Sequence, residues 1–202
     1  FRGRPEARAE RGEIPPSPGE PRLWLHAGTR VGLDTARPIA REWLRRHPDG
    51  RILLTVISDE ARREATDPPE PRTTVLFLPT DTPTAAHRFL AAAAPPTALC
   101  LGPGLWPTLS RALVRAGVPW FWLVGSYFPT PWRWARRLSP VFRPTLARPN
   151  RVLLGLAEDW DAIRSLGIPE DRIQVTGSPL LDAPRQVDPA GARRLRAALQ
   201  GR

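Results

Sequence analysis

The stretch Leu101-Gly-Pro-Gly-Leu-Trp-Pro107 decides the fold, because it joins a short apolar strand to an amphipathic helix. The preceding residues, Thr97–Leu101, are apolar and β-prone, whereas Pro107–Ala116 has apolar residues at helical spacing. In open α/β sheets, ligands bind at such junctions, at the carboxyl ends of the strands. The stretch therefore predicts both the class of fold and the edge of the sheet where a ligand binds.

The same alternation continues along the chain on both sides of this junction. Short β-prone runs are expected at Leu23–His26, Ile52–Ile57, Thr74–Leu78, Ala98–Leu101, Trp120–Val124, Val152–Leu156 and Ile173–Val175. Helical patterns lie between them at Asp34–Arg46, Asp59–Ala65, Pro83–Ala93, Pro107–Ala116, Pro131–Leu146 and Glu158–Leu166. Strands that alternate with helices predict an α/β protein with a Rossmann-like parallel sheet and helices on both faces.

Composition divides the chain into three parts. Residues 1–21 are rich in Arg, Glu, Pro and Gly and predict an extended basic lead-in. Residues 22–182 are expected to form the Rossmann-like domain, and residues 183–202 a linker and the start of a further domain. Since the chain contains no Met, we expect it to be part of a longer protein, with any N-terminal anchor and a C-terminal domain outside it.

The charge of the chain favours anionic partners. It has 202 residues, 30 basic against 20 acidic, a net charge of +10 and a sequence pI near 11.5. All the Lys and Arg positions are Arg, which is also typical of a GC-rich genome. No run approaches the roughly 18 to 20 apolar residues of a membrane span. The single cysteine, Cys100, is expected to be a buried apolar residue, because no second Cys can pair with it.

Several common kinds of site are not indicated. No His, Asp and Glu group has metal-ligand spacing, so we expect no metal, and no cofactor motif is present. Ser126 and Ser178 lack the context of a serine hydrolase. His26 ends a strand, where it either bonds neighbouring backbone or contacts a ligand. His47 and His87 lie on helices beside Arg and are expected to be exposed.

The loop after the first strand is a candidate ligand site. Gly28 and Gly32 permit a tight turn and close approach of a phosphate, although they also suit an ordinary turn. The loop does not match the dinucleotide fingerprint, because it lacks the GxGxxG spacing.

A Trp- and Arg-rich segment, Pro131 to Arg151, holds the strongest cluster of charge. No Asp or Glu interrupts it, and its aromatic and basic residues include Trp132, Arg133, Trp134, Arg136, Arg137, Phe142 and Arg143. Arg binds phosphate oxygens in pairs and Trp favours the headgroup boundary, so the segment predicts contact with an anionic membrane. The alternatives are a helix that packs its Trp side chains into the core and a nucleic-acid surface. Nucleic acid is the least favoured because no reading motif accompanies the charge.

Several short motifs, taken in order, resemble the N-terminal half of the 3-deoxy-D-manno-octulosonic acid (Kdo) transferases. They are Leu23-Trp-Leu-His-Ala before Val31-Gly32, Leu78-Pro-Thr-Asp-Thr-Pro83, Leu105-Trp-Pro107, Phe142-Arg-Pro-Thr-Leu-Ala-Arg148, and Leu166-Gly167 followed by Asp171-Arg-Ile-Gln-Val-Thr-Gly177. The resemblance covers roughly residues 5 to 185. It implies the GT-B glycosyltransferase fold, of which this chain would be the acceptor-side half.

The resemblance also implies a function. Kdo would pass from CMP-Kdo to lipid A at the cytoplasmic face of the inner membrane, with the nucleotide sugar held by a C-terminal half. The residues that line the cleft would be Gly28, Arg30, Gly32, Gly104 and Trp106. Of these, Arg30 would contact a phosphate group. The Trp- and Arg-rich segment would engage the lipid acceptor or the bilayer.

The chain departs from the family at its reactive positions. Where the family has a Glu as general base, this chain has Leu33, and Asp34 one place later is the candidate replacement, or simply an acidic residue in the first turn of a helix. The family's acidic residue before LWP is replaced by Gly104. Its Asn-Ala-Arg after the fifth strand is replaced by Gly125-Ser126-Tyr127, and its Lys after Thr-Gly-Asn by Leu180. Two functions therefore stay open: a divergent Kdo transferase, or an inactive paralogue that binds an anionic lipid or a partner protein.

Overall fold

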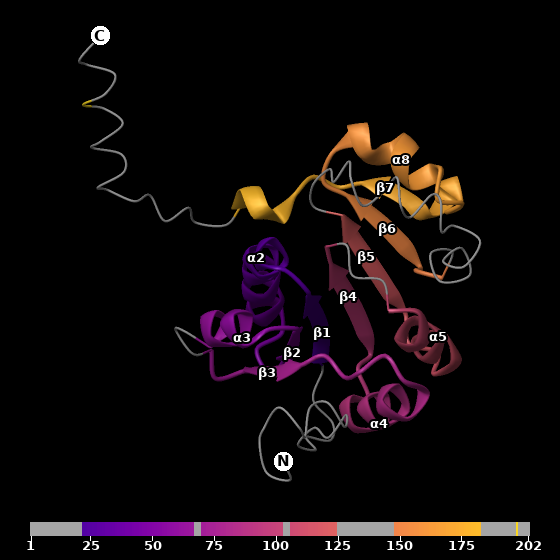
Figure 1. Ribbon diagram of the computed structural model, residues 1–202. Coiled ribbons are helices and arrows are strands. Elements are labelled where there is room, and N and C mark those ends of the chain that lie inside the picture. Colours follow the sequence, from indigo (N-terminus) through magenta and orange to yellow (C-terminus); the bar gives the residue numbers. More distant parts are fainter. Residues whose placement is uncertain (1–21, 67–69, 103–105, 125–147, 183–196, 198–202) are drawn as a thin grey trace.

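The structure is a computed structural model that describes residues 22–66, 70–102, 106–124, 148–182 and 197 (Figure 1). The expected lead-in, the core of the Trp- and Arg-rich segment at 132–143, and Gly104 lie outside the described residues. The expected linker and tail at 183–202 also lie outside, apart from residue 197.

Seven parallel strands form one sheet in the order β3-β2-β1-β4-β5-β6-β7 (Figure 1). The strands are β1 (Arg22–Ala27), β2 (Arg51–Val56), β3 (Thr73–Phe77), β4 (Thr97–Leu101), β5 (Trp120–Val124), β6 (Arg151–Leu154) and β7 (Ile173–Val175). Each expected strand is present, within about two residues of its expected bounds. Together with the helices, this sheet confirms the predicted α/β, Rossmann-like class.

Helices connect the strands. The α-helices are α2 (Arg30–Arg46), α3 (Asp59–Ala65), α4 (Pro83–Ala93), α5 (Pro107–Arg115) and α8 (Trp160–Arg164). Short 3₁₀ turns are η1 (Ala157–Asp159), η2 (Glu170–Arg172) and η3 (Pro179–Asp182). The prediction of one continuous helix at 158–166 was wrong, because this segment forms the 3₁₀ turn η1 followed by the short helix α8.

Helix ends follow the expected capping chemistry. Thr82 accepts the N–H of Ala85 with its hydroxyl and is followed by Pro83 at the first turn of α4. Gly117 and Gly167 have φ of 67° and 86°, the left-handed conformation that ends a helix at little cost for glycine.

The sheet is buried on both faces. Leu23, Leu25 and Ala27 of β1 pack with α2 and α3 on one face, whereas Trp24 packs on the other face with α4 and α5. The Trp24 ring lies 4.8 Å from the ring of Phe89. Because successive strand residues point to opposite faces, this alternation fixes the register against both helix layers.

The order of the strands reverses beside β1, at an edge of the sheet that we call the crevice. From β1 the chain moves outward through β2 to β3, and then returns past β1 to form β4 on its other side. The connections that leave β1 and β4 therefore run to opposite faces of the sheet. Between the carboxyl ends of these two neighbouring strands lies the topological switch point, where ligands bind in open α/β sheets.

Candidate ligand-binding crevice

The loops after β1 and β4 meet at this switch point. Gly102 follows β4 with a φ of 93°, and a Cβ added to it would lie 3.6 Å from Oγ1 of Thr29 in the other loop. Its N–H donates to the carbonyl of Leu123 (3.0 Å), and its carbonyl accepts the indole N–H of Trp122 (2.7 Å). The loop after β4 is thus tied to β5 and lies close to Thr29, and its positive φ would strain a residue with a Cβ at position 102.

Gly32 lies in α2 rather than in a loop. Sequence reasoning placed it in a ligand-lining loop spanning Gly28 to Asp34, but α2 begins at Arg30 because the hydroxyl of Thr29 accepts the N–H of Gly32 (3.1 Å). Gly32 is buried, and a Cβ there would lie 3.0 Å from the carbonyl oxygen of Leu101. Its lack of a side chain therefore allows α2 to pack closely against the ends of β1 and β4.

Asp34 is half-buried in the second turn of α2. The prediction of an acidic residue in the first turn was wrong, because the helix starts four residues earlier than expected and its first turn has no acidic residue. A helix whose first turn has no acidic residue favours an anion at its positive end.

Arg30 is the exposed basic residue at the start of α2. Its side chain is 69% exposed, and its Nη2 lies 3.2 Å from Oε1 of Glu64 on α3. Arg37, two turns further along α2, shares the same carboxylate at 3.8 Å. Because an exposed ion pair of this kind contributes little to stability, Arg30 can exchange Glu64 for an anionic ligand at small cost.

His26 joins three elements below the crevice. Its ring, at the end of β1, is only 4% exposed. Nδ1 lies 3.2 Å from the carbonyl oxygen and 3.0 Å from Oγ1 of Thr55 on β2, while Nε2 accepts the indole N–H of Trp106 (3.1 Å). Since the indole can only donate, the proton of the neutral ring lies on Nδ1. Of the two interpretations for His26, the structural histidine is confirmed.

Burial keeps the His26 ring neutral. Desolvation lowers the pKa of His26 to about 4, against a smaller opposing effect from its hydrogen bond to the Thr55 carbonyl. With both nitrogens engaged, the ring cannot accept a proton from a substrate without losing the bond to Trp106. His26 therefore positions the start of α5 and does not serve as a general base.

Asp81 supplies the cap that α5 lacks in its own sequence. Trp106 at the N-cap position makes no side-chain capping bond. Instead, Asp81, in the loop between β3 and α4, accepts the N–H groups of Thr108 (3.1 Å) and Leu109 (2.9 Å). The Asp81 motif quoted for the family thus has a structural role here, because its carboxylate occupies the positive end of α5.

Other singled-out residues lie away from the crevice. His87 is exposed as expected, but His47 is half-buried, because its ring stacks on Trp43 with 3.8 Å between ring centroids. Cys100 is half-buried against the core, and desolvation raises the pKa of its thiol to about 12. No described group of three or more His, Cys, Asp or Glu side chains has the geometry to hold a metal ion.

Asp159 is a buried carboxylate that sequence reasoning did not single out. It is 0% exposed at the start of α8, and neither of its carboxylate oxygens has a hydrogen-bond donor among the described residues. Burial, with a smaller contribution from the charge of Glu158, raises the pKa of Asp159.

The crevice thus contains some expected residues together with others that the sequence did not single out. Gly28, Arg30 and Trp106 lie at the edge where the sequence placed them, whereas the missed contributors are Thr29 and Glu64. Thr29 could have been found from its place before a helical pattern, since Thr is a favoured N-cap. The Glu64 pairing joins two helices and has no signal in the local sequence.

A parallel sheet in this order, with its crevice at the switch point, defines the Rossmann-like half of a GT-B protein. The UDP-GlcNAc 2-epimerase of Neisseria meningitidis bound to UDP-GlcNAc aligns with 80% of this chain and 47% of its own, at a TM-score of 0.58 and 16% identity. Anabaena Alr3699/HepE in complex with UDP and glucose aligns with 90% of this chain and 50% of its own, at a TM-score of 0.59 and 12% identity.

Within this fold, the chain belongs to the 3-deoxy-D-manno-octulosonic-acid transferase (kdotransferase) family, whose N-terminal domain matches residues 5–183. A relative, the 3-deoxy-D-manno-octulosonic acid transferase of Bordetella pertussis, is 30% identical over 185 residues. The alignment covers 89% of this chain and 41% of the relative. This chain therefore spans less than half the length of that relative.

Proposed function

We propose that this chain is the acceptor-binding half of a sugar transferase that moves Kdo from CMP-Kdo to a lipid A-type anionic acceptor in lipopolysaccharide biosynthesis. The observation that carries the proposal is the crevice between β1 and β4 in a chain of the Kdo transferase family. CMP-Kdo would bind mainly to a C-terminal half that this chain does not include. No separate cofactor or metal is part of the proposal.

Arg30 binds a phosphate of the acceptor in this proposal. It lies at the first residue of α2, where the helix end also favours an anion. Binding would transfer the guanidinium from Glu64 to the ligand. Gly28, Gly104 and Trp106 would line the path of the acceptor, and Gly32 would let α2 lie close beside it.

Asp34 is the candidate general base. It lies one helical turn beyond Arg30, on the same helix. It would remove the proton from the acceptor hydroxyl as the sugar is transferred. His26 is not available for this role, because its ring nitrogens are committed to Thr55 and Trp106.

The membrane side of the proposal rests on the sequence of the Trp- and Arg-rich segment. Trp132 and Trp134 would enter the headgroup layer at the cytoplasmic face of the inner membrane. The neighbouring guanidinium groups would bind lipid phosphates; they are those of Arg133, Arg136, Arg137 and Arg143. None of the described helices is long and apolar enough to cross a bilayer.

A second function is favoured by how few reactive groups are free in the crevice. Among the described residues there, His26 and Asp81 are committed to structural hydrogen bonds and Arg30 is paired with Glu64. An inactive paralogue that binds an anionic lipid or a partner protein would need only the cationic surface and not a base.

Assay of the full-length protein with CMP-Kdo and a lipid A precursor separates these functions. We expect turnover, detected as a mass increase of one sugar on the acceptor. Asp34→Asn should lower kcat by about 100-fold or more, since general bases contribute at least that much. Arg30→Ala should raise KM for the acceptor, whereas Arg37→Ala, which also removes a partner of Glu64, should not. Acceptor binding without turnover by the wild-type protein would contradict transferase activity and favour the inactive paralogue.

Sedimentation with anionic vesicles tests the membrane contact separately. Replacing Trp132 and Trp134 by Ala, or Arg136 and Arg137 by Ala, should each reduce the pelleted fraction. A wild-type protein that stays in the supernatant would contradict the bilayer assignment while leaving sugar transfer open.

A further inference from the structure

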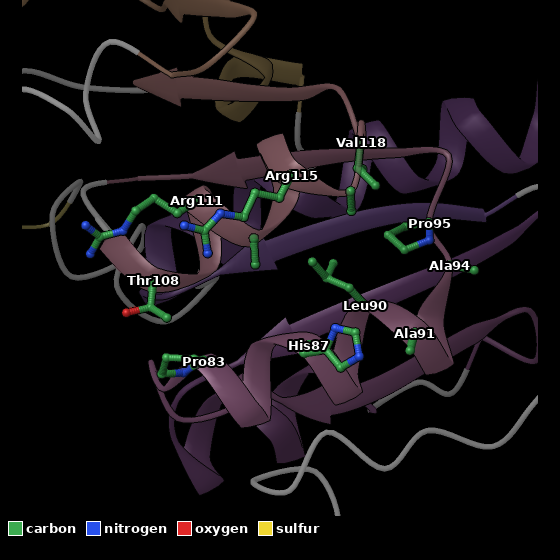
Figure 2. A pocket seen from close by; sticks show the side chains of 12 residues that line it. Pro83, His87, Leu90, Ala91, Ala94, Pro95, Thr108, Arg111, Arg115 and Val118 are labelled. Carbon is green, nitrogen blue, oxygen red and sulfur yellow. The ribbon is translucent and has the colours of Figure 1, made fainter.

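A long groove lies between α4 and α5, away from the crevice between β1 and β4 (Figure 2). Its volume is about 830 Å³, within the range of small-molecule binding sites. One wall is formed by α4, through His87, Leu90 and Ala91, and the other by α5, through Arg111 and Arg115 among others. Each set has the spacing of a single helix face.

Small side chains keep this groove open. Ala91 and Ala94 line its α4 side and Ala112 and Ala116 line its α5 side, together with the buried Leu90. The helices pack against each other, but alanines at these positions leave space that larger side chains would fill. The result is an apolar channel that follows the helices for about 13 Å, the length of a nine-residue helix.

The charge on the groove is of one sign. Arg111 and Arg115 stand on its α5 wall, and none of its described lining residues is Asp or Glu. The sequence from residue 82 to 157 contains no acidic residue at all. In the described part of the chain, neither Arg111 nor Arg115 forms an ion pair, and Nε of Arg111 donates to the carbonyl of Pro107 (3.1 Å). Within the described residues, both guanidinium groups are therefore without an acidic partner.

The polar and apolar linings occupy different parts of the groove. Figure 2 shows Pro83 and Thr108 at one end, and Ala94, Pro95 and Val118 at the other. The two arginine side chains extend toward the end with Thr108, so the opposite end is lined by aliphatic groups alone. A ligand that fits both parts has an anionic head and an apolar chain.

We propose that this groove binds the alkyl chain of a phosphate-bearing amphiphile, with the phosphate against Arg111 and Arg115. Arg binds phosphate oxygens well because it can donate two N–H groups at once. Burial of the ligand's alkyl chain at the aliphatic end of the groove removes apolar surface from water and stabilises the complex. A nucleic acid strand would find no cationic contact in that half of the groove. The proposal does not depend on sugar transfer, since none of the crevice residues lines the groove.

Calorimetric titration of the intact protein with dodecyl phosphate, below its micelle concentration, tests this site. We expect saturable binding of one molecule per chain. Octyl phosphate should bind roughly tenfold more weakly or worse, because each buried methylene strengthens binding up to about fourfold. Dodecyl maltoside, which has the same chain without charge, should also bind roughly tenfold more weakly, and inorganic phosphate should give no measurable binding.

Three variants locate the binding. The double variant Arg111→Ala with Arg115→Ala should bind dodecyl phosphate about tenfold more weakly or worse. Its affinity for dodecyl maltoside should be unchanged. Arg88→Ala is the matched control, because Arg88 is exposed on α4 beside His87 but does not line the groove. Ala91→Phe, at an exposed position, should block both amphiphiles, and circular dichroism confirms that each variant is folded.

Several outcomes would overturn the proposal. Equal affinities of the double variant and Arg88→Ala would exclude a phosphate at the arginines, and full binding by Ala91→Phe would exclude the groove. Binding to intact anionic vesicles but not to monomeric dodecyl phosphate would show that this face contacts a bilayer and does not bind a single alkyl chain. A dimer that Ala91→Phe dissociates would make it an interface between copies.

Discussion

His26 shows how one buried side chain can hold the two sides of a ligand crevice together. Its neutral ring donates from Nδ1 toward Thr55 and accepts the indole N–H of Trp106 at Nε2. Trp24 adds a further bond to the same threonine, donating from its indole to Oγ1 (2.9 Å). These groups connect β1, β2 and the start of α5 inside the protein, where an unpaired polar group is costly.

Protonation of His26 should destabilise the fold. Its pKa is about 4 in the folded protein and near 6.5 when unfolded, so the unfolded chain binds more protons between these values. The stability that the neutral ring contributes is complete above pH 6.5 and is lost as the pH falls toward 4. We expect the free energy of unfolding in urea to be about 2 kcal/mol lower at pH 5 than at pH 7.5 because of this group.

His26→Gln is the control for this pH effect, because Gln is polar but does not titrate in this range. The variant is expected to be less stable than the wild type at pH 7.5, yet to lose less stability on going to pH 5. An identical pH dependence of unfolding in the two proteins would show that His26 is not the titrating group.

Gly32 and Arg30, both near the start of α2, have different roles because of their size and charge. Without a Cβ, Gly32 brings α2 against the carbonyl of Leu101, so the helix end reaches the crevice. Arg30, the first residue of this helix, is exposed, and among the described residues its ion-pair partner is Glu64. Position along one helix therefore separates a packing residue from an exposed basic one two residues away.

Among the helices, α5 depends on a cap from a distant part of the chain. Asp81 accepts two backbone N–H groups of its first turn, although 26 residues of sequence lie between Asp81 and Thr108, which is the first donor. The carboxylate thereby holds α5, and the Trp106 turn before it, against the loop that precedes α4. The start of α5 cannot shift without breaking these bonds.

Asp81→Ala should lower the free energy of unfolding by about 1 to 2 kcal/mol, the usual cost of removing a helix cap. Asp81→Asn keeps an acceptor oxygen and should lose less. Chemical denaturation of the three proteins at neutral pH measures the difference. Equal stabilities of wild type and Asp81→Ala would mean that water satisfies the N–H groups of α5 as well as the carboxylate does.

The order of the elements was predictable from the sequence because apolar strand runs, proline starts and glycine stops are local signals. The start of α2 was not found, since Asp34 was taken as a first-turn residue while the hydroxyl of Thr29 sets the boundary. The capping of α5 by Asp81 and the pairing of Arg30 with Glu64 join distant segments. Neither leaves a pattern within a single stretch of sequence.

The whole molecule is a sheet with two helix layers that offer different surfaces. At the switch point, α2 begins with the exposed Arg30, close to the carboxyl ends of β1 and β4. On the opposite layer, α4 and α5 enclose the basic and apolar groove. Leu101 to Pro107 indicated the carboxyl edge of the sheet, because in a βαβ unit the chain passes there from a strand to a helix. The groove could not be predicted in this way, because it is lined by alanines of two separate helices.

The position of a bound acceptor tests this account most directly. A lipid A precursor with a photoreactive diazirine beside its acceptor hydroxyl can be cross-linked to the full-length protein, and the adducts mapped by mass spectrometry. We predict adducts within residues 28–34 and 102–107, reduced by Arg30→Ala but not by Arg37→Ala. Saturable cross-linking confined to other parts of the protein, and unchanged by Arg30→Ala, would show that the crevice between β1 and β4 does not hold the acceptor.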